Sequence, residues 1–181
     1  MAEIFFTKRR TLELLQRLDE DLEREGYQRK ISLYSMGGTK MVLSGLRHST
    51  VDIDFLISRE DFRVLGFYVF ELDRKYKIRL DLFPEGQFPG YVYSDFKDNA
   101  YVSHYRFKRL DLYFIDDIDF VITKALAWRR KDREDLESLF SIRKIPKQQI
   151  LERLQKVKFD PDKEEALKKN FNEFLREFYQ S

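Results

Sequence analysis

The segment VDIDFLI at residues 51–57 restricts the possible folds of this chain more than any other part of the sequence. Its side chains alternate, so Asp52 and Asp54 leave one face of a predicted strand and the apolar residues leave the other. Two further runs of strand length occur at residues 31–36 (ISLYSM) and 110–115 (LDLYFI). The chain is therefore predicted to contain a sheet that carries carboxylates on one face.

Helices are predicted on either side of these strands. Leucines spaced three and four residues apart predict a helix over residues 8–25, and Gly26 is expected to end it. A short helix is predicted over residues 39–46. Ser58 is expected to cap the helix that follows the alternating strand, because its hydroxyl can accept a hydrogen bond from a free backbone N–H.

The second half of the chain continues this mixture. Strands are predicted over residues 76–83 and 101–107, and a hairpin through Lys108-Arg109 would join the latter to the strand at 110–115. From Asp117 onward the chain is predicted to be helical, with interruptions at its prolines. This order of elements predicts the α+β class, with helices packed on a mixed β-sheet and a helical C-terminal part.

Length and composition exclude several classes of protein. The 181 residues suit one domain, which we place at residues 1–141, with a C-terminal helical extension over 142–181 packed on the same domain. A hydrophobic content of 43% argues against disorder, and the lack of cysteine excludes disulfides, thiolate zinc sites and cysteine nucleophiles. No segment approaches the ~20 apolar residues that span a bilayer, and the N-terminus is unlike a signal peptide. A cytoplasmic protein with no membrane partner is expected.

A glycine pair, Gly37-Gly38, stands between the strand at 31–36 and the helix at 39–46. Glycines at such a position let backbone N–H groups approach a phosphate, and the following helix presents its N-terminus to the same anion. On its own the pair is more typical of a tight turn. With the aspartates downstream, it predicts a phosphate site that includes Thr39.

Asp52 and Asp54 are the predicted metal ligands. Two carboxylates one pleat apart can share divalent cations, and a pair of such cations can hold both oxygens of a phosphoryl transfer. A third carboxylate is expected, for which Asp81 is preferred and Asp111 is the rival, because both lie in alternating strands. The alternative is that these aspartates simply face solvent.

A second charged segment follows residue 123. In a continuous helix Lys124, Trp128, Lys131 and Asp135 would share one face, and Lys124 could neutralise a triphosphate. The alternative is a surface of helix with internal salt bridges. Near the C-terminus an apolar stripe is expected to pack on the domain or to form a dimer or partner contact: Leu167, Phe171, Phe174 and Phe178.

These motifs resemble the polymerase-beta-like nucleotidyltransferases, in which two small residues precede an Asp-hydrophobic-Asp pair. The string GGTKMVLSGLRHSTVDIDFLI is similar to the AbiEii-type, abortive-infection branch, and the segment KALAWRRKDREDL resembles that branch as well. The matching residues of the first string are Gly37, Gly38, Thr39, Arg47, Thr50, Asp52 and Asp54. Those of the second are Lys124, Arg129, Asp132 and Asp135.

The resemblance implies a nucleotidyltransferase that uses magnesium, with two ions expected, to move a nucleoside monophosphate from a nucleoside triphosphate to an acceptor. It implies metal-binding and catalytic roles for Asp52, Asp54 and Asp81, and nucleotide binding by the remaining matched residues other than Asp132. Similar toxins modify tRNA ends, so tRNA or a protein is the expected acceptor. Alternatives are a catalytically silent nucleotide- or RNA-binding module, a toxin–antitoxin-type interaction module with the same fold, and a structural interaction protein that uses its C-terminal helices.

Overall fold

The structure is a computed structural model that describes residues 5–76 and 80–180. These residues pack as two compact units. Unit 1 comprises the described residues of Met1–Glu85 and Ala100–Ile115, and unit 2 comprises Gly86–Asn99 and the described residues of Asp116–Ser181. The predicted domain at residues 1–141, with residues 142–181 as a helical extension packed on it, stays a prediction.

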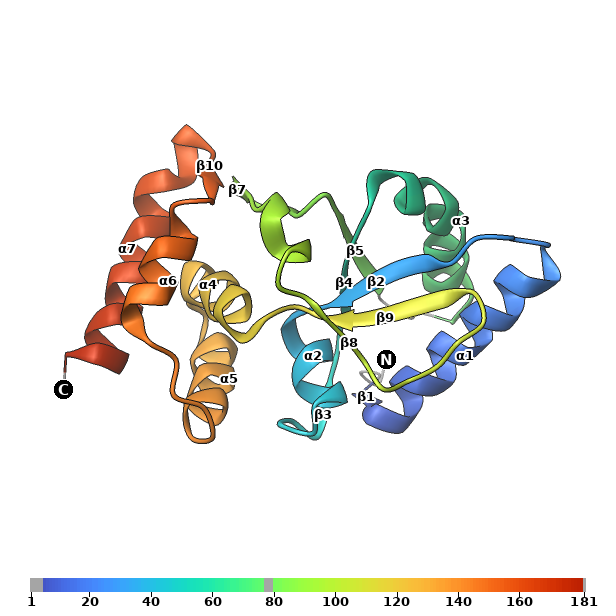
Figure 1. Cartoon of the computed structure of the whole chain (residues 1–181), viewed down its shortest axis with the longest axis horizontal. Coiled ribbons are helices and arrows are strands. Elements are labelled where there is room, and N and C mark those ends of the chain that lie inside the picture. The colour runs from blue at the N-terminus through green and yellow to red at the C-terminus, as the bar shows by residue number, and fades with distance from the viewer. Residues whose placement is uncertain (1–4, 77–79, 181) are drawn as a thin grey trace. The chain divides into compact units, whose positions relative to one another are not determined.

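Unit 1 is built around a five-stranded mixed sheet with the order β5-β4-β2-β9-β8 (Figure 1). The pairs β4–β5 and β2–β9 are parallel, whereas β2–β4 and β8–β9 are antiparallel. The strands are β2 (Ile31–Ser35), β4 (Ile53–Ile57), β5 (Leu80–Pro84), β8 (Tyr101–Val102) and β9 (Leu110–Phe114). This arrangement confirms the predicted mixed sheet.

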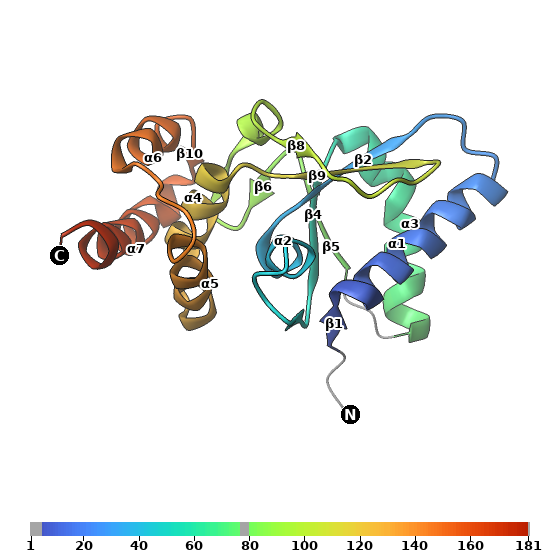
Figure 2. The same cartoon turned by 60° about the horizontal axis from the view of Figure 1, so that its bottom comes forward.

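Two long helices, α1 (Lys8–Arg24) and α3 (Arg59–Tyr76), lie along this sheet (Figures 1 and 2). Leucines of α1 and Leu65 of α3 share one core cluster with every second residue of the strands, such as Ile53 and Phe55. Because alternate side chains point to opposite faces, Asp54 and Asp81 lie on the face away from this core. A short helix, α2 (Gly37–Leu43), and a two-stranded ladder of β1 (Phe6–Thr7) with β3 (Ser49–Thr50) complete unit 1.

Local sequence signals set the helix ends. Thr7 caps α1, and Gly26 follows its end with a φ of +75° that favours glycine. The predicted cap at Ser58 is confirmed, since its hydroxyl accepts from the Asp61 N–H at 3.0 Å. Asp160 caps the last helix, with Pro161 at its first position.

Unit 2 is mainly helical (Figure 1). Its helices are α4 (Asp117–Ala127), α5 (Arg130–Phe140), α6 (Lys147–Leu154), α7 (Pro161–Tyr179) and the short η1 (Ser94–Lys97). A small antiparallel sheet joins β6 (Gln87–Phe88), β7 (Tyr91–Val92) and β10 (Lys158–Phe159). None of the helices in the described part of the chain is both long and apolar enough to cross a membrane.

The C-terminal aromatic stripe packs inside unit 2. Phe171 and Phe174 of α7 are buried, and the Trp128 ring lies edge-on to Phe174 with centroids 5.9 Å apart. The ring of Phe140 on α5 lies tilted against that of Phe178, with centroids 4.8 Å apart and an interplanar angle of 46°. The stripe therefore forms the core of unit 2, and a contact with a second copy or a partner through the C-terminal helices stays a prediction.

Several predicted boundaries were wrong for a physical reason. The strand expected over 101–107 is only β8, and residues 103–109 form the connection in place of a tight hairpin at Lys108-Arg109. The Lys108 and Arg109 N–H groups are instead bound by the carboxylate of Asp19 on α1, which holds this connection against the helix. Part of the strand expected over 76–83 lies outside the described residues.

Three errors concern the functional motifs. The glycine pair is the first turn of α2 rather than a turn before it, and β4 begins at Ile53, so Asp52 precedes the strand. The helix after Asp117 is not continuous either. Trp128 takes a left-handed conformation, with a φ of 48°, and separates α4 from α5.

Candidate functional site

Asp54 and Asp81 are neighbours on the face of the sheet away from the leucine core. Strands β4 and β5 are parallel, and their register places Asp54 directly beside Asp81. Adjacent strands are ~4.8 Å apart, so both carboxylates can reach one ligand. Both side chains are half-buried. Two carboxylates this close can share a divalent cation.

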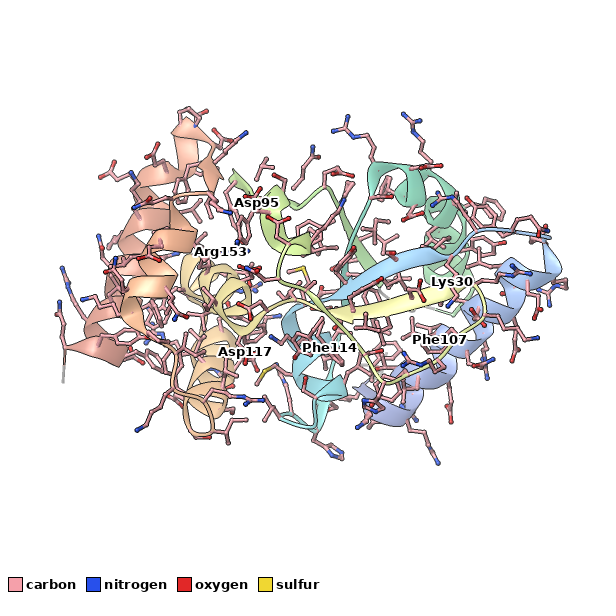
Figure 3. The ribbon with its side chains drawn as sticks, in the orientation of Figure 1. Lys30, Asp95, Phe107, Phe114, Asp117 and Arg153 are labelled. Carbon is pink, nitrogen blue, oxygen red and sulfur yellow. The ribbon has the colours of Figure 1, made fainter. Side chains whose placement is uncertain are left out.

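The other two candidate carboxylates are placed differently. Asp52 is half-buried in the bend between β3 and β4, two residues before Asp54. Asp111 lies beside Ser32 of β2, four residues (~13 Å) along that strand from the residue opposite Asp54. Its carboxylate accepts from Lys30 Nζ at 2.7 Å, and Lys30 marks the end of the sheet remote from Phe114 (Figure 3). Of the two rivals, Asp81 is the one that adjoins Asp54.

Gly37 packs directly against the Asp54 carboxylate. A Cβ built on Gly37 would lie 2.5 Å from Asp54 Oδ2, and the residue has a φ of +53°. Only glycine fits both restrictions without strain. The first turn of the seven-residue helix α2 is thereby held within contact distance of the carboxylate.

The next two residues of α2 fix its position on the sheet. The Thr39 hydroxyl accepts from the Asp54 N–H at 2.8 Å, and its side chain is fully buried. Gly38 lies against Thr50, whose side chain is also buried. Thr39 and Thr50, both predicted to bind nucleotide, are thus packed where they position Gly37 and Asp54.

We expect Gly38→Ala to destabilise the protein, because its new methyl group would lie 2.3 Å from Thr50 Oγ1 and 2.9 Å from Thr50 Cβ. Overpacking of this kind typically costs about 1–3 kcal/mol of unfolding free energy. Gly66→Ala in α3 is the matched control: nothing lies within 4 Å of its added Cβ. That change should stabilise the helix by about 0.5–1 kcal/mol. Urea unfolding of both variants measures the contrast, and equal stabilities would contradict the packing described.

Lys40 was not singled out by the sequence. It is 2% exposed, and its Nζ donates to the carbonyl oxygen of Ile115 at 2.8 Å. A lysine so deeply buried is rare unless it is paired, so it marks α2 as more than a surface helix. A single lysine in a short helix of mostly small and apolar residues gives no sequence signal. Arg47 follows α2 and is half-buried, and its backbone N–H donates to the Met41 carbonyl at 3.2 Å.

The lysine motif forms a buried ion cluster in unit 2. Lys124 is 5% exposed, and its Nζ lies 2.9 Å from Asp132 Oδ1 and 2.6 Å from Asp135 Oδ2. Arg129 binds the other oxygen of Asp132 at 2.7 Å. Burial alone would raise the pKa of Asp132, but the Arg129 hydrogen bond and the charge of Lys124 hold it below its ordinary value. The four motif residues are therefore brought together, with the Lys124 ammonium bound by two carboxylates.

A second buried network in unit 2 was missed. Asp119 is fully buried, and its carboxylate accepts from the Tyr93 hydroxyl and, at 3.0 and 2.9 Å, from two nitrogens of Arg153. Arg153 also donates to the backbone carbonyl of Asp95 at 3.2 Å, and Figure 3 shows it reaching toward that residue. Burial raises the pKa of Asp119, and the bonds from Tyr93 and Arg153 only partly offset this. The network joins η1, α4 and α6, which are too far apart in sequence for any spacing rule to reveal.

A mixed sheet with adjacent aspartates and a glycine-led helix against one of them is the arrangement expected of a nucleotidyltransferase fold. The chain belongs to the family described as "Nucleotidyltransferase of unknown function (DUF6036)", whose sequence profile matches residues 13–180. No curated protein matches the chain significantly. A similar solved structure is an antigenic nucleotidyltransferase-like protein from Paracoccidioides brasiliensis, with 16% identity, a TM-score of 0.48, and coverage of 91% of this chain and 95% of that one.

The family match confirms the nucleotidyltransferase superfamily that the motifs predicted. The narrower AbiEii-type branch stays a prediction. So do the toxin–antitoxin role and the individual functions of the site residues.

Proposed function

We propose that the protein transfers a nucleoside monophosphate from a nucleoside triphosphate to an acceptor hydroxyl with magnesium. The observation that carries this proposal is the Asp54–Asp81 pair, side by side on parallel strands with Gly37 against one carboxylate. This is a site where a phosphate group could approach two carboxylates and a backbone N–H at once. Membership of the nucleotidyltransferase family supports the same activity.

The donor set fits magnesium bound together with a substrate. Magnesium is usually held by one or two carboxylates plus water and substrate phosphates, rather than by an all-protein cage. Asp54 and Asp81 supply two such carboxylates from rigid strands, and Asp52 stands two residues away. When bound, two magnesium ions would neutralise the phosphate oxygens and polarise the α-phosphorus.

The proposed transfer balances without a further reagent. The acceptor hydroxyl oxygen forms a bond to the α-phosphorus, and the bond from that phosphorus to the bridging oxygen of the β-phosphate breaks. Pyrophosphate leaves with the electrons of the broken bond. The hydroxyl proton passes to Asp81, which lies on the edge strand β5. Asp54 is fixed by Thr39 on its N–H and by Gly37 on its carboxylate, so it holds its geometry throughout.

The N–H groups of the first turn of α2 would donate to the β- and γ-phosphates, with Arg47 as a second source of positive charge. Arg129 is exposed, whereas Lys124 and Asp135 are already bound in the buried cluster. We therefore assign Lys124 and Asp135 to the support of unit 2.

A second candidate function is a nucleotide-binding module without turnover. Within residues 5–76 and 80–180, no three or more His, Asp or Glu side chains gather closely enough to hold a metal ion by themselves. A module of this kind would bind a nucleoside triphosphate and transfer nothing.

Thermal unfolding with magnesium and each of the four nucleoside triphosphates tests the site. At a ligand concentration near 100 times Kd, the gain of about 2.7 kcal/mol should raise Tm by about 5–10 °C. The rise should be lost in Asp52→Ala/Asp54→Ala. Incorporation of labelled nucleotide into total RNA or protein then separates the two candidates: binding with no incorporation favours the silent module, and incorporation by the double variant would exclude this site.

A further inference from the structure

The two histidines of the chain and several of its cations gather on one surface of unit 1. Thr7 of β1 lies opposite Ser49 of β3, which brings Lys8 and His48 to the same end of this strand pair. Lys8 Nζ lies 5.7 Å from the Tyr105 ring centroid, and the His104 ring lies 4.1 Å from the same ring. We call this the Tyr105 surface, and its members are Lys8, Arg9, Arg10, His48, His104, Tyr105 and Arg106.

The charge of this surface differs from that of the whole chain. The segments 5–13, 43–50 and 101–108 together carry six Lys or Arg and one Glu, whereas the chain has 34 Lys or Arg and 32 Asp or Glu. All of the cations and both histidines of the Tyr105 surface are exposed. The Tyr105 surface is therefore locally positive although the chain as a whole is near neutral, and local positive charge is the electrostatic pattern of a polyanion site.

The helix dipole does not favour these cations, although Arg9 also lies 3.6 Å from Glu13 one turn along the helix. The first turn of α1 holds Lys8, Arg9 and Arg10 and no acidic residue, although positive charge is unfavourable at a helix N-terminus. The helices α3, α4 and α7 carry acidic residues there, whereas α6, like α1, carries none. Helix α1 thus lacks the favourable interaction between an acidic first turn and the helix dipole, and departures from such local rules are common at functional sites.

Aromatic rings lie among the charges. Tyr105 is half-buried beneath Lys8 and His104, and Phe5 is 49% exposed next to Arg10, which donates to the Phe5 carbonyl at 3.0 Å. Rings beside a positive groove are what unpaired bases stack on, whereas a duplex hides its base faces. The combination favours a single strand.

The Tyr105 surface begins one short helix away from the acidic pair. Helix α2 starts at Gly37 against the Asp54 carboxylate and ends at Leu43, whose carbonyl accepts from the Tyr105 hydroxyl at 3.5 Å. Seven residues of helix span ~10 Å, or about three stacked nucleotides. Figures 1 and 2 both show β1 and β3 beside α2.

We infer that the Tyr105 surface binds the sugar–phosphate backbone of a single-stranded nucleic acid, and that this strand is the acceptor whose terminal hydroxyl reaches Asp54 and Asp81. Its identity as the acceptor rests on the proposed function. The binding surface itself rests on the charge and ring geometry alone.

The test is fluorescence anisotropy with a labelled 12-nucleotide single-stranded RNA over a series of salt concentrations. Lys8→Ala/Arg9→Ala/Arg10→Ala should bind at least tenfold more weakly than the wild type. Because each lost phosphate contact removes ~0.7 from the slope of log affinity against log salt, three should flatten it by about 2. The matched control is Lys168→Ala/Lys169→Ala/Arg176→Ala, which removes the same charge from the exposed side of α7 and should bind like the wild type. His104→Ala/Arg106→Ala, which leaves α1 untouched, should also weaken binding and guards against misfolding of the first variant.

Unchanged affinity and salt slope in both surface variants would overturn the inference, as would stronger binding to a duplex or to phosphatidylserine vesicles than to the single strand. A DNA oligonucleotide of the same sequence distinguishes the source: equal binding indicates backbone recognition, and preference for RNA indicates contacts to the 2′-hydroxyl. Wild-type protein that binds RNA but transfers no nucleotide would contradict the proposed function without contradicting the proposed binding surface.

Discussion

Asp54→Asn and Asp81→Asn are each expected to reduce nucleotide transfer at least a hundredfold, while Asp111→Asn should stay within about twofold of the wild type. The loss of one ligand charge at the reacting phosphate removes about 3 kcal/mol of transition-state stabilisation or more. Asparagine has nearly the same shape as aspartate, so the strands should keep their register. Initial rates of labelled nucleotide incorporation at saturating magnesium measure the effect.

Asp111 is an informative control because the sequence alone cannot separate it from Asp81. Both stand in alternating Leu-Asp-Leu segments, but Asp81 lies beside Asp54 and Asp111 pairs with Lys30 at the far end of β2. Equal losses in Asp81→Asn and Asp111→Asn would mean that register does not define the site. Equal thermal stability of all three variants would show that the losses are not due to unfolding.

The sequence predicts the sheet and the acidic face well because both depend on local alternation. Once the segments were strands, Asp54 had to leave the face opposite Ile53 and Phe55, and Asp81 the face opposite Leu80. Which strands would be neighbours could not be predicted. Pairing of β4 with β5 is set by the crossover through α3, and its register by the packing of apolar residues in the core.

The roles of the glycines and threonines near the acidic pair were harder to predict. A pattern of glycines and threonines is compatible with phosphate contact or with close packing. Only the structure shows that Gly38 lies against Thr50 and that the Thr39 hydroxyl accepts from the Asp54 N–H. The break at Trp128 could not be predicted, because no glycine or proline marks it in the sequence. Because of that break, Lys124 and Asp135 meet through the turn between two helices rather than along one helix face.

We expect Lys124→Ala to destabilise the protein by about 3–5 kcal/mol, because it leaves two carboxylates buried without their cation. Asp132 is fully buried, Asp135 is 3% exposed, and both lie within hydrogen-bonding distance of Lys124 Nζ. Arg130→Ala is the matched control. Its ion pair with Glu134 is exposed, so its loss should cost less than ~0.5 kcal/mol. Urea unfolding at pH 7 measures both.

The same cluster predicts a dependence on pH. The folded-state pKa of Asp132 is held below its ordinary value because the hydrogen bond from Arg129 and the charge of Lys124 outweigh burial. Its contribution to stability is therefore present above the unfolded-state pKa of ~3.9 and is lost as pH falls through the lower folded-state pKa. The unfolding free energy of the wild type should fall steeply as pH drops below ~3.9. The unfolding free energy of Lys124→Ala should fall less over the same change in pH.

Lys124 also separates support of the fold from contact with nucleotide. Lys124→Met/Asp135→Asn removes the cation together with one of its carboxylates, while Arg129 remains on Asp132 at 2.7 Å. This double variant is expected to recover much of the unfolding free energy that Lys124→Ala loses, because replacing both members of a buried ion pair costs far less than removing one of them. If Lys124 only supports unit 2, the double variant should keep the affinity of the wild type for magnesium and nucleoside triphosphate. A folded double variant that no longer binds triphosphate would instead assign Lys124 to the nucleotide site.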